Sequence, residues 1–425
     1  MSLPRLLRGV EPGRMSYDDH RRVHGELTLA AHGRGHGAAS ALVAELKRSG
    51  LRGRGGGAFP LAAKLEAVRR SRRAPVVVVN ATEGEPMSFK DRTLVQALPH
   101  LVIDGAICCA AALATDTIVF ALDESSGETA AALATALHER PEFAGRLTAP
   151  EIVRVPGGYV TGHETSVVNF LNTGTALPTR ARPRISERGY NRRPTLMSNA
   201  ETLAHAALIV RHGSDWFREL GSDDEPGSVL VTLSGAVRCP GVYEVEHGAQ
   251  LATLIDAAEG QSAPLRAFLF GGYAGGWVDA ADATRARLSE AGLRPLSASF
   301  GAGVVVALPS SACPVAEVSR VADWMAGESA GQCGPCVNGL AAIADTLAWI
   351  CDGRPGRDAE SELRRFCALV TGRGACAHPD GAARFVSSAL AVFAAEIEDH
   401  ARHGPCDACD RRAVLSTPEH RSPVP

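Results

Sequence analysis

The chain has 425 residues, which favours about three domains, and a globular composition with 45% hydrophobic and 21% charged residues. A net charge of −3 excludes a general attraction to nucleic acid or anionic lipid. No apolar run approaches the roughly 20 residues of a membrane span, and the start of the chain lacks the apolar core of a signal peptide.

The first part of the chain predicts an irregular lead-in over residues 1–37, followed by an α/β domain over 38–225. Strands and helices alternate there, which favours a mostly parallel sheet, and a β-branched run at 75–79 is typical of a buried parallel strand. The expected elements are a helix at 41–48, the strand at 75–79, a polar loop at 80–92, a helix at 101–114, a strand at 117–122, a helix at 128–139 and a strand at 152–155.

The pattern changes after residue 225. Residues 226–305 predict a small unit of strands and one helix, 306–403 predict a bundle of four helices, and the Pro-rich segment 404–425 is expected to be flexible. The expected strands are 228–237, 241–245 and 267–271, and the expected helices are 249–258, 314–326, 339–352, 357–370 and 381–401.

The most informative motif is Glu328-Ser-Ala-Gly-Gln-Cys-Gly-Pro-Cys-Val-Asn-Gly, with Cys376 far downstream in Ala-Cys-Ala-His-Pro. A tight Cys-x-x-Cys with a remote cysteine is typical of iron–sulfur ligands. A cubane needs four ligands, however, and Cys333, Cys336 and Cys376 supply three, because Ala330 stands where another cysteine is expected. The pattern therefore predicts a [4Fe-4S] cluster whose last iron takes water or another side chain, with a [3Fe-4S] cluster as the alternative.

Two further cysteines near the end of the chain leave other metal sites open. Cys406 and Cys409 could supply the missing thiolate, or the two Cys-x-x-Cys pairs could form a tetrahedral zinc site. The absence of any metal is the third possibility. The other cysteines are interpreted as buried thiols (Cys108, Cys109, Cys351, Cys367) or as lying beside prolines without ligand-like spacing (Cys239, Cys313). Eleven cysteines without an export signal favour a reducing cytoplasm.

Three loops carry glycines and polar groups. The glycine run at 53–57 with Lys64 could bind a single phosphate through backbone N–H groups and one cation, although it is neither a P-loop nor a Gly-x-Gly-x-x-Gly motif. The loop Asn80-Ala-Thr-Glu-Gly-Glu-Pro follows a strand, where α/β folds bind ligands, and the loop at 156–165 follows another. An ordinary flexible loop or solvated turn explains any one of them, but less easily all three.

Together these motifs resemble the flavin-binding component of bacterial NADH:quinone oxidoreductase, the F subunits, and related diaphorase subunits. That family has Gly-Leu-Arg-Gly-Arg-Gly-Gly-Ala-Gly-Phe-Pro, Asn-Ala-Asp-Glu-Gly-Glu-Pro-Gly-Thr-Phe-Lys-Asp-Arg, Gly-Ala-Tyr-x-x-Gly-Glu-Glu-Thr and Asn-Asn-Val-Glu-Thr-Leu. This chain has the corresponding segments 50–60, 80–92, 158–165 and 198–203 in the same order. The resemblance covers roughly residues 40–400. It implies a β-grasp fold for residues 226–305 and an iron–sulfur bundle for 306–403.

The resemblance also implies a function. In the family, FMN accepts a hydride from NADH and passes single electrons to a [4Fe-4S] cluster, so an electron-transferring oxidoreductase is expected here. Hydride transfer would occur near Glu85 and His163, and no catalytic side chain is assigned. The implied cofactor-binding residues are Gly53, Gly55, Phe59, Lys64, Asn80, Glu83, Glu85, Tyr159, Gly162, Glu164 and Asn199.

Several positions depart from the family pattern. Thr82, His163 and Ser198 replace an Asp, a Glu and an Asn, and the pair Gly57-Ala58 is reversed. The family clamps adenine between two aromatic rings, where this chain has Ala67 and Ile185 by alignment. Because the aromatic clamp is absent, the sequence predicts weak NADH binding. The alternative is that the protein uses a donor other than NADH.

The expected partners are a nicotinamide dinucleotide and a ferredoxin-like or other iron–sulfur protein. No nucleic acid is expected, and membrane association is expected only at the periphery, through a partner. The alternative to an enzyme is a non-catalytic scaffold or assembly protein that keeps the fold and has lost electron transfer. Ala330, Ala67 and Ile185 favour this alternative, whereas the retained flavin residues oppose it.

Overall fold

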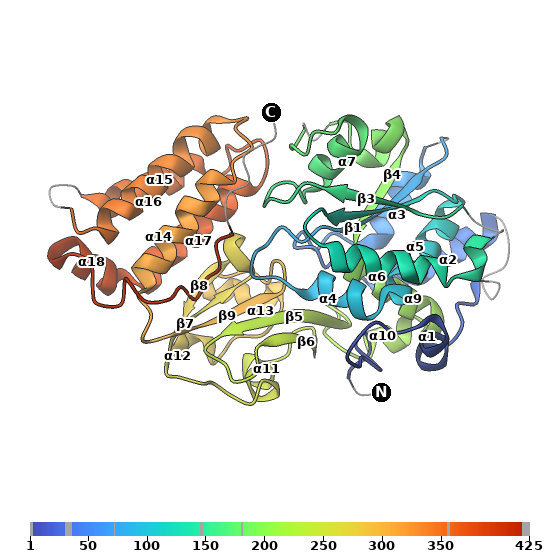
Figure 1. Cartoon of the computed structure of the whole chain (residues 1–425), viewed down its shortest axis with the longest axis horizontal. Coiled ribbons are helices and arrows are strands. Elements are labelled where there is room, and N and C mark those ends of the chain that lie inside the picture. Colours follow the sequence, from blue (N-terminus) through green and yellow to red (C-terminus); the bar gives the residue numbers. More distant parts are fainter. Residues whose placement is uncertain are drawn as a thin grey trace.

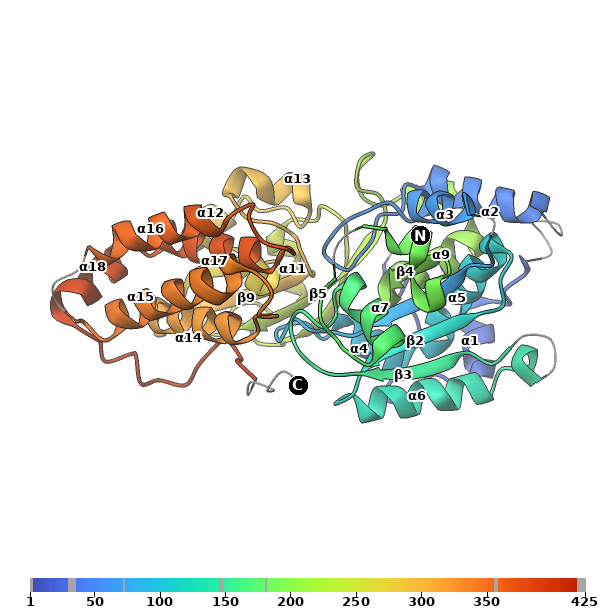
Figure 2. The same ribbon diagram turned by 90° about the horizontal axis from the view of Figure 1, so that it is seen from above.

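The computed structural model describes residues 3–29, 36–71, 73–144, 148–179, 182–354 and 358–418. Parts of the expected lead-in (1–2 and 30–35) and of the tail (419–425) lie outside this range, as does residue 357 at the start of an expected helix. The parallel-sheet unit and the helical bundle lie at opposite ends of the molecule, with a mixed sheet between them (Figure 1 and Figure 2).

A four-stranded sheet of order β3-β2-β1-β4 forms the core of the first unit, and all its neighbouring strands are parallel. This confirms the predicted α/β domain with a parallel sheet. The elements are α1 (Tyr17–His24), α2 (His36–Ser49), α3 (Leu61–Arg69), β1 (Val76–Ala81), α4 (Lys90–Ala97), α5 (Pro99–Leu113), β2 (Ile118–Asp123), α6 (Gly127–His138), β3 (Glu151–Val155), α7 (Glu164–Thr173), α8 (Ile185–Arg188), β4 (Thr195–Asn199), α9 (Ala200–His212) and α10 (Ser214–Arg218), with 3₁₀ turns at Pro141–Ala144 and Tyr190–Arg192.

Alternate residues of β1 face two different cores, as the period of a strand requires. Val77 and Val79 pack with α5 and α9, whereas Val76 and Val78 pack with α7 on the other face. A Cβ at Gly105 on α5 would lie 1.9 Å from the carbonyl oxygen of Leu203 on α9. Only glycine therefore lets these two helices approach so closely.

The expected irregular lead-in contains a helix, α1. Its N-cap is Ser16, whose side chain accepts a hydrogen bond from the N–H of Asp19. Its buried face carries His20 and His24 in place of apolar residues, and His20 Nε2 lies 2.7 Å from the buried carboxylate of Asp104. The helix was missed because a polar buried face gives no apolar period.

The second unit contains a five-stranded mixed sheet of order β6-β5-β9-β7-β8. The central pair β5–β9 is parallel, and the three other pairs are antiparallel. The 228–237/241–245 hairpin predicted from the sequence is present as β5–β6. The elements are β5 (Ser228–Gly235), β6 (Gly241–Glu246), α11 (Leu251–Ala257), β7 (Leu265–Phe270), β8 (Gly276–Asp279), α12 (Ala280–Ala283), α13 (Glu290–Leu293) and β9 (Val304–Pro309), with 3₁₀ turns at Gly272–Ala274 and Arg294–Leu296.

The third unit is helical, as predicted. The expected single helix at 381–401 is two helices, because the chain leaves helical geometry at Phe393 (φ −111°, ψ 28°). The elements are α14 (Pro314–Gly327), a π-helical turn (Pro335–Leu340), α15 (Ala341–Cys351), α16 (Ala359–Val370), α17 (His378–Val392) and α18 (Ala394–His403).

The segment 404–418 packs against the bundle, in contrast to the expected flexible tail. The backbone N–H groups of Val414 and Leu415 donate to the Glu317 carboxylate at 2.9 and 3.0 Å. Leu415 is fully buried in the bundle core. We call residues 404–418 the C-terminal strap.

Among the described residues, no single helix combines the length and apolarity of a membrane span. The pair α4–α5 reaches that threshold only when joined across a 97° bend.

Candidate functional site

The glycine-rich loop between α2 and α3 lies against the carboxyl edge of the parallel sheet. The N–H of Gly53 donates to the carbonyl of Phe59 at 2.9 Å, and the N–H of Arg54 donates to the Thr202 hydroxyl at 2.8 Å. A Cβ at Gly55 would lie 3.2 Å from the Cβ of Asn199. The small residues therefore allow the loop to lie directly on the start of α9.

Lys64, in the first turn of α3, is the cation beside this loop. Its Nζ contacts the Glu164 carboxylate at the start of α7 and lies 3.1 Å from the carbonyl oxygen of Met197. The Lys64 side chain is 25% exposed. The structure thus brings together two predicted cofactor residues, Lys64 and Glu164, from distant parts of the sequence.

Two polar loops meet where β1 ends. Asn80 and Asn199 are register partners on β1 and β4, and Asn80 Nδ2 donates to the carbonyl of Gly162 at 2.9 Å. Thr82, at the position where the family has Asp, donates its hydroxyl to Asn80 Oδ1 at 2.6 Å. A Cβ at Gly162 would lie 2.9 Å from Thr82 Oγ1, so glycine is needed for this close approach.

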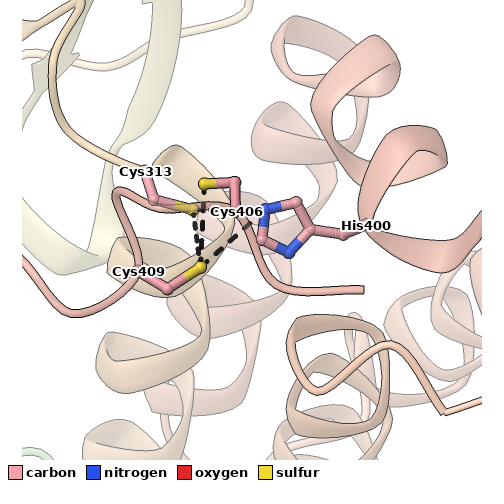
Figure 3. A group of neighbouring side chains, drawn as sticks. All are labelled: Cys313, His400, Cys406 and Cys409. Atoms are coloured by element: carbon pink, nitrogen blue, oxygen red, sulfur yellow. Dashed lines mark hydrogen bonds between the residues drawn. The ribbon is translucent and has the colours of Figure 1, made fainter. Parts of the chain in front are cut away.

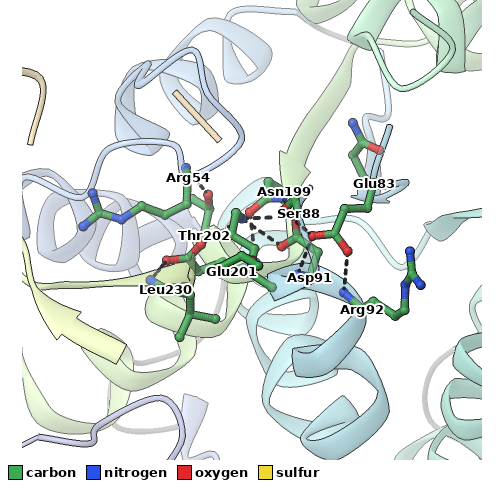
Figure 4. A network of polar contacts seen from close by, with 12 residues as sticks. Arg54, Glu83, Ser88, Asp91, Arg92, Asn199, Glu201, Thr202 and Leu230 are labelled. Atoms are coloured by element: carbon green, nitrogen blue, oxygen red, sulfur yellow. Dashed lines mark hydrogen bonds and ion pairs between the residues drawn. The ribbon is translucent and has the colours of Figure 1, made fainter. Parts of the chain in front are cut away.

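Glu83 is an acceptor in a dense polar network behind these loops (Figure 4). Its carboxylate accepts hydrogen bonds from the Ser88 hydroxyl at 2.6 Å and from the N–H groups of Asp91 and Arg92 at 3.1 and 3.2 Å. Burial, followed by the nearby Asp91 charge, raises the pKa of Glu83. The contacts fix the side chain at the start of α4.

The same network continues through Asn199, whose Nδ2 donates to Asp91 at 2.6 Å. Lys90 Nζ lies 3.1 Å from Asp91 and 2.8 Å from the buried Glu201 carboxylate. Burial opposes the charge of Lys90, but Asp91 and Glu201 raise its pKa, so it stays protonated. Glu201 also accepts from the Leu230 N–H at 2.8 Å, which ties the network to β5. Figure 4 shows how these groups converge from α4, α9 and β5.

We call the glycine-rich loop at 53–57 and the loops at 80–86 and 156–165 the flavin-side loops, after the cofactor that the resemblance implies. Glu85 lies where they meet the second unit. It accepts hydrogen bonds from the N–H groups of Tyr273 at 2.8 Å and Met87 at 3.3 Å. Burial raises the pKa of Glu85 to about 7, against the hydrogen bonds from Tyr273, Met87 and Tyr159 that favour the anion. Glu85 is therefore a carboxyl group that gains or loses its proton near neutral pH.

Tyr159 joins the flavin-side loops to the helical bundle. Its N–H donates to the Glu328 carboxylate at 2.7 Å. Its ring lies 5.7 Å from Trp324 in an edge-on arrangement and 5.4 Å from His378, between ring centroids. Glu328 opens the cysteine motif and His378 follows Cys376 closely, so the Tyr159 loop contacts both segments of the thiol site.

His163 occupies the N-cap position of α7, without a capping hydrogen bond from its side chain, where the resemblance implies a glutamate. Burial lowers the pKa of its ring, with an opposing effect of Glu164, so the ring is neutral at neutral pH. The loop therefore lacks a negative charge at this position.

The positions that the resemblance places near the nicotinamide dinucleotide carry few large side chains. Phe59 is 52% exposed at the end of the glycine-rich loop. Ala67 and Ile185 lie on the neighbouring helices α3 and α8, and both are partly buried. No aromatic ring occupies either position.

The three predicted cluster ligands are near enough to influence one another electrostatically, but in the described part of the chain their sulfur atoms do not form a group within 4.8 Å of one another. The charges of Cys333 and Cys376 both act on Cys336, whose pKa burial raises to about 12. Burial also affects Cys333, but hydrogen bonds from the backbone of Ala375 and from Cys336 lower its pKa below the usual value. Ala375 immediately precedes Cys376, so the two cysteine segments are in direct contact. Ala330 leaves the fourth position without a thiol.

The structure groups the other two candidate ligands elsewhere. Cys406 and Cys409 lie with Cys313 and His400, with their ligand atoms all within 4.8 Å of one another. The sequence-based hypothesis that they complete the cluster of Cys333, Cys336 and Cys376 therefore has no support in this arrangement.

Comparisons with known proteins agree with this geometry. Residues 46–207 match the family model of the Nuo51 FMN-binding domain, and residues 316–400 match the NADH-ubiquinone oxidoreductase-F iron-sulfur binding region. The chain is 31% identical to an F subunit of the NADH-quinone oxidoreductase of Rhizobium meliloti, covering 86% of this chain and 90% of that protein. It belongs to the family of NADH-quinone oxidoreductase F subunits. The resemblance stated from the sequence motifs is thereby confirmed.

Other members of this family are similarly related. The F subunit of the Streptomyces coelicolor enzyme is 30% identical over 84% of this chain and 82% of its own length. Among solved structures, a chain of an NAD+-reducing [NiFe]-hydrogenase in the H2-reduced state matches with a TM-score of 0.78 and 29% identity. That match covers 89% of this chain and 65% of the hydrogenase chain, so the relative is considerably longer.

The residues of this family member fit FMN. Glycines 55 and 56 leave the loop without side chains where it faces Asn199 and the Gly301 region, and nothing lies within 4 Å of a Cβ at Gly57. One lysine beside this loop matches the single phosphate of FMN. The three adjacent thiols fit an iron–sulfur cluster in their chemistry, with one coordination position left over.

Some groups that hold the site were missed from the sequence. Asp91 and the N–H of Glu201 bond the predicted residue Asn199, and the N–H of Tyr273 bonds the predicted residue Glu85. Thr202 accepts from the N–H of Arg54 in the glycine-rich loop, and spacing alone reveals none of these contacts. Charged residues such as Lys90, Asp91 and Glu201 at buried helix positions were the available signal, because buried charges are normally paired.

Proposed function

We propose that this chain is an electron-transferring oxidoreductase that takes hydride from NADH or a similar donor and passes electrons through an iron–sulfur cluster to a protein acceptor. The observation that carries the proposal is the contact of one loop, at Tyr159, with both the flavin-side residues and the thiol segments. Its N–H donates to Glu328, its side chain lies beside Glu85, and its ring packs on His378.

FMN, when bound, supplies the conversion between two-electron and one-electron chemistry. Lys64 holds the phosphate, with the backbone of Gly53 and Gly55 close by. Asn80, Glu83 and Asn199 present polar groups at the carboxyl edge of β1 and β4, where their partners fix them. Gly162, Glu164 and Tyr159 close the opposite side of this proposed site.

Phe59 and Glu85 are proposed to contact the nicotinamide and ribose of the donor. Because the Glu85 carboxyl group gains and loses its proton near pH 7, it is suited to exchange a proton with the reacting pair. The neutral ring of His163 lies in the same loop region and removes one negative charge from the donor's approach. No side chain is assigned to the hydride transfer itself.

Cys333, Cys336 and Cys376 are proposed as the cluster ligands. With Ala330 at the fourth position, a [4Fe-4S] cluster would carry one iron with an exchangeable ligand, and a [3Fe-4S] cluster would need no further thiol. A ferredoxin-like or other iron–sulfur protein is the proposed acceptor. The proposed location is the cytoplasm, with membrane association only through a partner.

The proposed domains are 38–225 for FMN and NADH, 226–305 with a β-grasp fold, and a four-helix iron–sulfur domain at 306–403, flanked by 1–37 and 404–425. The strand order β6-β5-β9-β7-β8, with a parallel central pair and α11 between β6 and β7, supports the β-grasp assignment.

A scaffold without electron transfer is the second candidate, favoured by Ala67, Ile185 and Ala330. Anaerobic purification followed by NADH titration separates the two. Bound flavin that NADH bleaches, with stoichiometric iron, supports the oxidoreductase. A protein purified without flavin and iron that cannot be loaded with either supports the scaffold. Flavin that dithionite bleaches but NADH does not indicates a different donor.

A further inference from the structure

Four metal-ligating side chains converge between the bundle and the C-terminal strap (Figure 3). Cys313 caps the N-terminus of α14, His400 lies on α18, and Cys406 and Cys409 lie in a turn of the strap. Cys313 and His400 are buried, and the strap cysteines are more exposed. The group thus joins three segments that are separate in sequence.

The distances fit one tetrahedral ion. Cys409 Sγ lies 3.6 Å from Cys313 Sγ and 3.8 Å from Cys406 Sγ, and His400 Nε2 lies 3.4 Å from Cys313 Sγ and 3.9 Å from Cys409 Sγ. Zinc bonds of about 2.3 Å to sulfur and about 2.0 Å to nitrogen place tetrahedral ligand atoms roughly 3.6 to 3.8 Å apart. The four atoms therefore stand where the ligands of a zinc ion would stand.

Other arrangements fit less well. In an iron–sulfur cubane each thiolate binds a different iron, which spreads the sulfur atoms more widely than around one ion. A disulfide requires sulfur atoms at about 2.05 Å, far shorter than the 3.8 Å between Cys406 and Cys409. Thiolate and imidazole ligands, all four supplied by protein, are typical of structural zinc.

We propose that Cys313, His400, Cys406 and Cys409 form a structural zinc site that fastens the C-terminal strap to the bundle. Cys313 occupies the N-cap of α14, where its Sγ accepts the Ala316 N–H at 3.3 Å, and this contact holds the sulfur in place. The proposal does not depend on the function of the flavin and cluster sites.

The strap that the zinc fastens reaches all three units. After the cysteines, the Ser416 carbonyl accepts the Tyr273 hydroxyl at 2.6 Å, and the Pro418 carbonyl accepts the Trp324 indole N–H at 2.9 Å. The Ser416 N–H also contacts the sulfur of Met87 at 3.4 Å. The zinc site therefore anchors a segment that holds the bundle and the second unit against the flavin-side loop.

Metal analysis of the full-length protein, purified anaerobically, tests the site. We expect about one zinc per chain in addition to iron. Cys409→Ser and Cys313→Ser should each lower the zinc content about tenfold after gel filtration and leave iron unchanged. Cys336→Ser should do the reverse. Cys351→Ser is the matched control, because this thiol lies near Cys409 but outside the group of four, and zinc should be retained.

Two further measurements remain informative if a variant binds metal poorly because it folds poorly. The wild-type protein loaded with Co²⁺ should show the absorption of tetrahedral, thiolate-bound cobalt, and truncation after His403 should abolish it while iron is retained. Hydrogen exchange of residues 404–418 should become faster in Cys409→Ser than in Cys351→Ser.

Three results would overturn the proposal. The first is a Cys409→Ser variant that keeps its zinc. The second is a Cys409→Ser variant that loses iron and keeps zinc. The third is a purified wild-type protein that holds a single iron ion at this site. Unchanged exchange of the strap in a zinc-free variant would overturn the anchoring role.

Discussion

The loops proposed to bind flavin match the family motifs more completely than the positions proposed to contact the donor and the cluster. On the flavin side, Lys64, Asn80, Glu83 and Asn199 are present and held by partners. Ala67, Ile185 and Ala330 stand where the resemblance implies aromatic rings for the donor and a thiol for the cluster.

The polar network around Glu83 and Asp91 also joins the first unit to β5, so its residues stabilise the fold as well as the proposed site. We expect substitutions in this network to affect both folding and flavin binding, and substitutions at Ala67, Ile185 or Ala330 to affect donor binding or the cluster.

The largest expected effect is on the retained side. Lys64→Ala should weaken FMN binding about tenfold to a hundredfold, because a charge-assisted contact contributes about 1.5–3 kcal/mol. The flavin content of purified protein and a titration with free FMN measure this. Lys47→Ala, which removes a surface lysine paired with Glu66, is the control and should bind FMN normally. Unchanged flavin content in Lys64→Ala would remove Lys64 from the site.

On the donor side, Ala67→Phe combined with Ile185→Phe should lower the apparent Michaelis constant for NADH by roughly thirtyfold, if each ring contributes about 1 kcal/mol, the lower end for a base–aromatic contact. Reduced nicotinamide mononucleotide, which has no adenine, is the control donor and should gain nothing. A wild-type Michaelis constant already in the low micromolar range would contradict the prediction.

At the cluster loop, Ala330→Cys should supply a fourth thiolate. We expect about one additional iron per chain if the wild-type cluster has three irons. If it already has four, the iron content should stay constant and the electron paramagnetic resonance signal should change as the exchangeable ligand is replaced. Ala330→Ser is the matched control for size. Identical iron content and identical spectra in wild type and Ala330→Cys would place residue 330 away from the cluster.

The smallest effect concerns Glu85, where the two regions meet. Its pKa of about 7 in the folded state exceeds the value of 4.5 expected for an exposed Glu. The folded protein therefore binds more protons between these values, and Glu85 makes stability fall as pH rises from about 4.5 to 7. The effect is absent below this window and complete above it.

Urea unfolding at pH 5 and pH 8 tests this. Glu85→Gln should lose less stability between the two pH values than the wild type, by on the order of 2 kcal/mol. Glu66→Gln on the surface should behave like the wild type. Equal pH dependence in Glu85→Gln and wild type would show that Glu85 does not titrate in this range.

The regular elements of the fold could be predicted where the apolar pattern is strong. The β-branched run that forms β1 and the 3.6-residue spacing of α14 both gave correct element types. Helix α1 and the break at Phe393 could not, because one depends on a buried histidine–carboxylate pair and the other on local geometry that leaves the apolar pattern intact.

The candidate site was predictable as far as local motifs extend. Glycine loops and Cys-x-x-Cys pairs are visible in sequence, so Gly55, Lys64, Cys333 and Cys336 could be named as candidates, and their roles stay predictions. The grouping of Cys313 and His400 with the strap cysteines could not be predicted. Cys313 and His400 each lie alone in the sequence, and only the packing of α14 against α18 brings them together. Tertiary contacts of this kind leave no spacing pattern.

The close approach at Gly105 has a consequence for mutational screens. A methyl group there would push α9 away from α5, and α9 carries Glu201 and Thr202 in its first turn, just after Asn199. A substitution deep in the core would then loosen the glycine-rich loop from a distance. Gly105 is thus a position where a conditional, temperature-sensitive loss of cofactor should arise without any change to a residue that touches it.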